Sequence, residues 1–148
     1  MRIEKKEAIV VDIDGTIADN LHRTHLVEGK KKDWGKFFEK MGDDKPIRES
    51  ILLVQKYFSE GLTVLITTGR LKKYEVLTRN WLDKHIGVDE YLLFQRENND
   101  FRSSIDLKKE IIVNIQGRFN IRIVMENDEK IVQMYKALGL NCIKLDLK

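Results

Sequence analysis

Apolar residues along this chain fall into short continuous runs separated by longer segments of helical spacing. The runs EAIVVDI (7–13) and LTVLITT (62–68) lack the alternation of a half-solvated strand, so they predict strands buried on both faces. Three further runs predict strands at YLLFQ (91–95), IRIVM (121–125) and CIKLDL (142–147). The pattern therefore predicts strands that recur along the whole chain.

Between these runs, apolar residues recur at the spacing of amphipathic helices. The expected helices run from Pro46 to Gly61, from after Gly69 to near Gly87, and over 103–115 and 128–138. Proline suits the first turn of a helix and glycine its end. Ser103 or Ser104 is placed to cap the helix that covers 103–115.

The alternation of strands and helices predicts the α/β class, with a doubly wound open parallel sheet in a single domain of 148 residues. Residues 19–45 interrupt the pattern around one short helical candidate, 33–41, and predict a flap or small insert without a large cap. In such sheets ligands bind beyond the carboxyl ends of the strands. The places to search are Asp12–Thr16, Thr67–Arg70, Gln95–Arg96 and Glu126–Asp128.

Composition limits the class of protein to which this chain can belong but does not define its binding partner. The chain is 42% hydrophobic and 34% charged, with a net charge of +3, which permits an anionic partner but does not demand one. No apolar stretch approaches the ~20 residues of a membrane span, and the N-terminal apolar run is too short for a signal peptide. The lone Cys142 suits the core of a reduced protein. We expect a cytoplasmic protein with no membrane partner.

The first strand ends in two aspartates, Asp12 and Asp14, followed by Gly15 and Thr16. An EF-hand calcium loop is excluded, because its glycine would stand at the sixth position of the run. A simple turn at Asp14-Gly15 leaves Asp12 without a reason to be charged beside a core strand. An acidic pair at this position suits a metal ion and a phosphate.

The other strand ends carry weaker signals. Thr67–Arg70 could hold an anion through a hydroxyl and backbone N–H groups at a helix N-terminus. The alternative interpretation of the same residues is a plain turn with a capping threonine. Lys108 lies in the first turns of an expected helix, where a lysine is ordinarily solvated. Capping and the helix dipole account for Asp128 and Glu129, but they do not account for Glu126, which still belongs to the strand.

Four places along the chain, which we call stations, resemble in their order the motifs of the haloacid dehalogenase superfamily of aspartyl-phosphate enzymes. They are DIDGT, ITTGR, Lys108 and MENDE. The resemblance spans essentially the whole chain. Three longer segments are similar to the 3′-phosphatase half of phage-type polynucleotide kinase–phosphatase. They are TTGRLKKYEVLTRNWL, FQREN with RSSIDLKKEII, and ENDEKIVQMYKALGLNC. Nothing matches the kinase half, because the chain has no G-x-x-x-x-G-K-[ST] run.

The resemblance implies a role for each station. Asp12 corresponds to the nucleophile and Asp14 to the general acid and base, while Thr68 and Lys108 correspond to residues that hold the transferring oxygens. The positions implied to bind substrate are Arg23, Gly69, Arg70 and Arg96. Ser104 departs from the family pattern, since it stands where a substrate-organising aspartate is aligned.

The resemblance also implies a bound Mg²⁺ ion. Its ligands correspond to the Asp12 side chain, the Asp14 main-chain carbonyl and the acid after the fourth strand. The family places two aspartates there, whereas this chain has Glu126 and Asn127 followed by Asp128. Either Glu126 ligates the metal and Asn127 holds a metal-bound water, or Asp128 reaches into the site.

Three functions follow as hypotheses. The first is removal of 3′-phosphates from nucleic-acid ends or nucleotides, motivated by Arg23, Arg70 and Arg96, since arginine suits bidentate phosphate contacts. The second is a nucleotidase or another small-molecule phosphatase. The third is a non-catalytic binding protein that kept the scaffold, for which the irregular Glu126-Asn127 pair argues.

Overall fold

The structure, a computed structural model, describes residues 4–144. Its centre is a parallel sheet of five strands in the order β5-β4-β1-β6-β7. The strands are β1 (Lys6–Asp12), β4 (Thr63–Leu71), β5 (Leu92–Arg96), β6 (Phe119–Met125) and β7 (Cys142–Ile143). In the register of β1 with β4, Asp12 pairs with Thr67, which brings the first two stations side by side.

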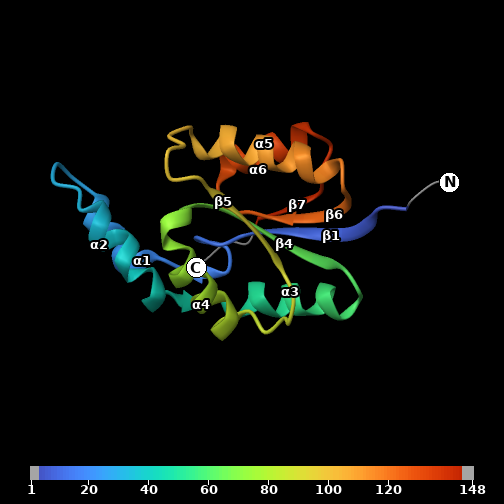
Figure 1. Ribbon diagram of the computed structural model, residues 1–148, viewed down its shortest axis with the longest axis horizontal. Coiled ribbons are helices and arrows are strands. Elements are labelled where there is room, and N and C mark those ends of the chain that lie inside the picture. The colour runs from blue at the N-terminus through green and yellow to red at the C-terminus, as the bar shows by residue number, and fades with distance from the viewer. Residues whose placement is uncertain (1–3, 145–148) are drawn as a thin grey trace.

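Helices cover both faces of the sheet (Figure 1). α3 (Arg48–Ser59) and α4 (Glu75–His85) lie on one face, and α5 (Ser104–Gln116) and α6 (Glu129–Ala137) lie on the other. Successive side chains of β1 enter the two cores in turn, so the strand is apolar at every position from Ala8 to Val11. The doubly wound α/β prediction is therefore confirmed. None of the described helices is long and apolar enough to cross a membrane.

The predicted insert forms a flap between two short antiparallel strands, β2 (Ala18–Asp19) and β3 (Lys45–Pro46). It extends past the carboxyl ends of the parallel strands, at the left of Figure 1. Its elements are α1 (Leu21–Thr24), η1 (His25–Val27), α2 (Trp34–Glu39) and η2 (Lys40–Asp43). Asp33 caps α2 by accepting a hydrogen bond from the Lys36 N–H.

Two local expectations need correction, and a third can be followed only in part. Pro46 pairs with Ala18 in β3 instead of opening α3, because the chain closes the base of the flap before the helix begins at Arg48. β4 continues through Gly69 to Leu71, and η3 (Lys72–Tyr74) precedes α4, so Gly69 and Arg70 lie in a strand and not at a helix N-terminus. Cys142 is half-buried against the core, and residues 145–147 of the last expected strand lie outside the described residues.

Candidate active site

A pocket of about 360 Å³ lies where β1, β4 and β6 end and the flap approaches the sheet. Of the predicted site residues, it brings together Asp12, Asp14, Arg23, Gly69, Arg70, Lys108, Glu126, Asn127 and Asp128. A wider hollow of about 1650 Å³ lies at the opposite edge of the sheet, where the strands begin, and holds none of the predicted stations. The candidate chemistry is therefore concentrated in the smaller pocket.

Lys108 joins the two acids that follow the central strands. Its Nζ donates to Asp12 Oδ1 at 2.6 Å and to Glu126 Oε2 at 2.8 Å. The Thr16 hydroxyl donates to the other Asp12 oxygen at 2.9 Å. Asp12, Lys108 and Glu126 are each at most 5% exposed. Lys108 is thus a buried partner of two carboxylates and not a solvated helix residue, and the Asp12 carboxylate is held at both oxygens.

This cluster carries an excess of negative charge away from water. Burial raises the pKa of Asp12 and of Glu126, and their mutual repulsion adds to the rise at Glu126, against the opposing effect of the lysine. Burial alone would lower the pKa of Lys108, but the two carboxylates outweigh it and hold that pKa above its usual range. Two buried acids that share one monovalent cation suit a further cation, and carboxylate oxygens are the ligands Mg²⁺ prefers.

The same pocket sets limits on how a metal would be held. Within residues 4–144, no three histidine, cysteine or acidic side chains form a ready-made metal cage. Asp12 and Glu126 would share a cation with main-chain oxygen and water, which is how Mg²⁺ is commonly bound. Asp128 is already engaged: its Oδ1 accepts from the N–H groups of Lys130 and Ile131 and caps α6.

Asp14 belongs to a second ionic cluster that joins the sheet to the flap. Arg23 and Arg70 each donate to Asp14 Oδ1 at 2.8 Å, and both also donate to the fully buried Asp44 carboxylate. Burial would raise the pKa of Asp14, but Arg70 and Arg23 outweigh that effect and hold it below its usual range. The resting site therefore favours the deprotonated form of Asp14.

Gly15 lies against Asn127, which follows β6 in the fourth station. It has φ +81°, and a Cβ built there would lie 2.2 Å from Asn127 Nδ2. The Asn127 Oδ1 lies 3.4 Å from the Thr16 hydroxyl, whose proton goes to the nearer Asp12 oxygen. Glycine is therefore favoured by the left-handed backbone conformation, and its lack of a side chain lets the Asn127 amide lie against the turn after β1.

Comparison with known proteins decides the family. The family of the polynucleotide kinase PNKP phosphatase domain matches residues 6–147. The chain belongs to this family. It is a phosphatase domain of the haloacid dehalogenase type.

Individual relatives are longer than this chain. A "Putative bifunctional polynucleotide kinase/RNA ligase" of Autographa californica nuclear polyhedrosis virus is 26% identical over 136 residues, which are 90% of this chain and 18% of the viral protein. A chain in the structure of the Pnkp1/Rnl/Hen1 RNA repair complex has a TM-score of 0.82 at 23% identity, covering 95% of this chain and 42% of its own length. The class C acid phosphatase of Bacillus anthracis with tungstate bound has a TM-score of 0.71 at 18% identity, and the match covers 96% of this chain and 67% of the acid phosphatase chain. The two structures show the shared fold.

Some residues predicted from the PNKP phosphatase resemblance lie elsewhere than at the pocket surface. Thr68 is fully buried, and its hydroxyl accepts from the Arg70 N–H. Arg96 donates to the carbonyls of Gly69, Asp100 and Arg102, so it braces the loop after β5 against β4. Neither residue lines the pocket. Their assigned roles toward a substrate stay predictions.

Two residues of this PNKP phosphatase site have no role in the sequence-based prediction. Thr16 holds the nucleophile candidate Asp12, and its place in DIDGT is a signal for such a role. Asp44 carries no signal of its own, because it acquires its partners only when the flap folds over β4. Its carboxylate accepts from Arg23, Arg70 and His22, and its carbonyl accepts from the Trp81 indole.

Proposed function

We propose that this phosphatase domain is a Mg²⁺-dependent phosphomonoesterase that removes 3′-phosphates from nucleic-acid ends or nucleotides through an aspartyl-phosphate. The observation that carries the proposal is the buried Asp12 carboxylate, held by Lys108 and Thr16 at the floor of the pocket. Membership of the PNKP phosphatase family supports the 3′-phosphate end as substrate.

The chain's own side chains supply the steps of the proposed reaction. A carboxylate oxygen of Asp12 attacks phosphorus while the bond to the leaving 3′-oxygen breaks, and Lys108 offsets the charge that gathers on the phosphoryl oxygens. Asp14 protonates the leaving oxygen. A phosphate dianion competes for Arg23 and Arg70, which weakens their hold on Asp14 and raises its pKa for this step.

Hydrolysis of the intermediate uses Asp14 in the opposite direction. Asp14 takes a proton from a water that attacks the aspartyl-phosphate, and Asp12 is released with inorganic phosphate. The residues that would hold Mg²⁺ are the Asp12 carboxylate, the Asp14 carbonyl and Glu126, with Asn127 beside them. The bound cation would offset the repulsion between these carboxylates and a phosphate dianion.

A substrate panel at fixed Mg²⁺ tests the function. We expect turnover of a 3′-phosphorylated oligonucleotide and a nucleoside 3′-monophosphate, with at least about tenfold lower kcat/KM on a nucleoside 5′-monophosphate, a loss that corresponds to about 1.4 kcal/mol. Activity confined to the 5′-monophosphate would support a nucleotidase instead. Failure to hydrolyse any ester, p-nitrophenyl phosphate included, would support a non-catalytic binding protein.

A comparison of Glu126→Ala with Asp128→Ala shows which acid after β6 would hold Mg²⁺. We expect Glu126→Ala to raise the Mg²⁺ concentration for half-maximal activity at least about tenfold, because Glu126 is the buried acid beside Asp12. Asp128→Ala should leave that concentration nearly unchanged and lower stability by about 1 kcal/mol through loss of the α6 cap. Activity titrations and thermal melts measure both quantities. The reverse ranking for Mg²⁺ would assign the ligand to Asp128.

A further inference from the structure

The flap presents a line of aromatic rings between the pocket and solvent. Phe37 and Phe38 line the pocket. Phe38 stacks between Tyr74 of η3 and Trp34, with ring centroids 5.1 Å and 5.9 Å away and interplanar angles of 29° and 27°. Trp34 also meets Phe37 edge-on at 5.6 Å. The rings therefore form one cluster that joins the lining of the pocket to the half-exposed Trp34.

Packing of the flap explains the inner rings but not the outer one. Arg23 lies over Phe37, with its guanidinium carbon 4.3 Å from the ring centre, and Phe38 rests on Tyr74 of the body. Trp34 supports these rings from one side and still leaves 49% of its surface exposed. A half-exposed tryptophan in contact with two rings that line the pocket offers a stacking surface for a planar group.

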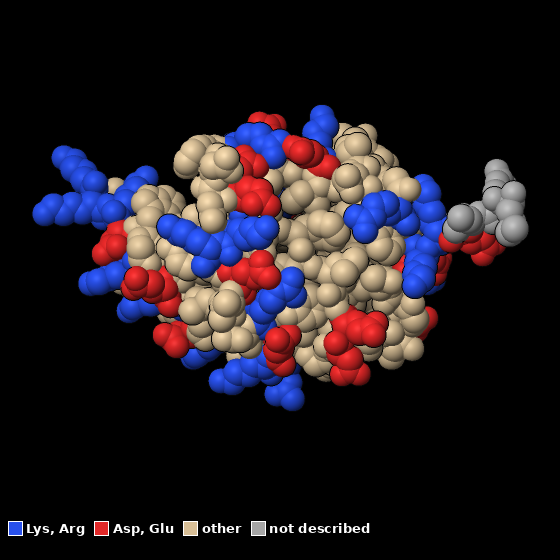
Figure 2. Space-filling view, in the orientation of Figure 1, with Lys and Arg blue, Asp and Glu red and all other residues tan. Residues whose placement is uncertain are grey.

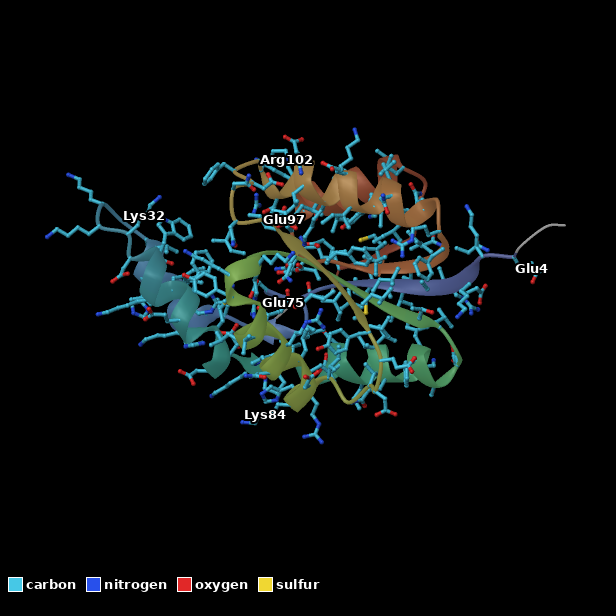
Figure 3. All side chains as sticks on the ribbon, in the orientation of Figure 1. Glu4, Lys32, Glu75, Lys84, Glu97 and Arg102 are labelled. Carbon is cyan, nitrogen blue, oxygen red and sulfur yellow. The ribbon has the colours of Figure 1, made fainter. Side chains whose placement is uncertain are left out.

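Positive charge accompanies the exposed ring. Lys30, Lys31 and Lys32 precede Trp34 in the chain, all are exposed, and among residues 4–144 no carboxylate forms an ion pair with any of them. Figure 2 shows basic side chains projecting from the outer end of the flap, and Figure 3 places Lys32 at that end. Exposed aromatic rings beside cationic side chains form the usual surface for single-stranded nucleic acid.

The size of the pocket directs the rest of a strand onto this surface. A volume of about 360 Å³ is near the lower end of the range for small-ligand sites, roughly 300–1,000 Å³, so only the end of a strand fits inside. We infer that the ring of Trp34, with Lys30, Lys31 and Lys32, binds the single-stranded nucleotides that precede the terminal 3′-phosphate, with a base stacked on Trp34. This inference rests on the proposed function and names the preferred substrate: a polynucleotide end over a mononucleotide.

The test measures the activity of each variant on two substrates. The measured quantity is the ratio of kcat/KM on a single-stranded 3′-phosphorylated oligonucleotide, in DNA and RNA forms, to kcat/KM on p-nitrophenyl phosphate. We expect Trp34→Leu, which keeps apolar bulk against Phe37 and Phe38, to lower this ratio about 5- to 150-fold, the effect of removing one base stack. Trp34→Phe, which keeps an aromatic face, should restore most of it. Leu52→Ala, an exposed apolar truncation on α3, is the matched control and should leave the ratio unchanged.

The lysines provide a second and independent measurement. Replacing Lys30, Lys31 and Lys32 together by glutamine should flatten the dependence of oligonucleotide KM on salt, by about 0.7 in the log–log slope for each phosphate that a lysine no longer neutralises. An unchanged ratio in Trp34→Leu together with an unchanged slope would overturn this inference alone. A wild-type chain that hydrolyses p-nitrophenyl phosphate but no 3′-phosphorylated end would overturn the proposed function, and this inference with it.

Discussion

Replacement of Asp12 by asparagine is expected to lower kcat by about 10⁴-fold or more, because an amide cannot serve as the nucleophile. The substitution keeps the size of the side chain and an oxygen that can accept from Lys108 or Thr16. It also removes one of two mutually repelling buried acids, so the fold should persist. Initial rates on p-nitrophenyl phosphate and on a 3′-phosphorylated oligonucleotide, with a thermal melt, measure both outcomes.

A matched control separates loss of the nucleophile from a general effect of removing acidic charge. Asp89→Asn changes an exposed aspartate at the opposite edge of the sheet and should keep full activity. Acid-quenched wild-type chain should also carry a covalent phosphoryl group during turnover, and Asp12→Asn should carry none. Turnover by Asp12→Asn within about tenfold of the wild type would show that another group, or water, attacks phosphorus.

The sheet and the edge that carries the candidate site could be predicted because both follow from local pattern and one topological rule. Continuous apolar runs specify buried strands, and parallel strands joined by helices place their carboxyl ends at one edge. The pairing of Asp12 with Thr67 is a consequence of that rule. The contact of Lys108 with Asp12, which joins residues 96 positions apart in the chain, does not follow from that rule, because only the resemblance to the haloacid dehalogenase superfamily indicates a role for this lysine.

The flap could be located from the sequence but not described. Its pattern of apolar residues is weak, and its contacts depend on how it folds over the body. The sequence indicates Arg23 as a residue for substrate, yet only 1% of it is exposed and it lies between Asp14 and Asp44. No periodicity marks Asp44, and no pattern in the chain distinguishes Arg96, which braces a loop, from an arginine that faces a ligand.

Replacement of Asp44 by alanine is expected to lower the free energy of unfolding by about 3–5 kcal/mol, because it takes from two buried arginines the fully buried one of the two carboxylates that they share. For a domain of this size, that loss lowers Tm by roughly 6–20 °C. The Asp44 carboxylate accepts from Arg23 at 2.8 Å and 3.0 Å and from Arg70 at 3.2 Å. Thermal and denaturant unfolding measure the loss.

Activity should fall as well, because the same two arginines orient Asp14. Without Asp44 both guanidinium groups have Asp14 as their remaining carboxylate partner, and the flap that carries Arg23 loses its main ionic contact with β4. At temperatures below the Tm of the variant, we expect kcat to be about 10- to 100-fold lower than in the wild type, because the general acid and base would be displaced. Asp43→Ala, next to Asp44 but exposed and without an ion pair among the described residues, should change neither Tm nor kcat appreciably. If Asp44→Ala instead melts like Asp43→Ala and keeps its rate, packing of the aromatic rings holds the flap in place and the buried charges do not.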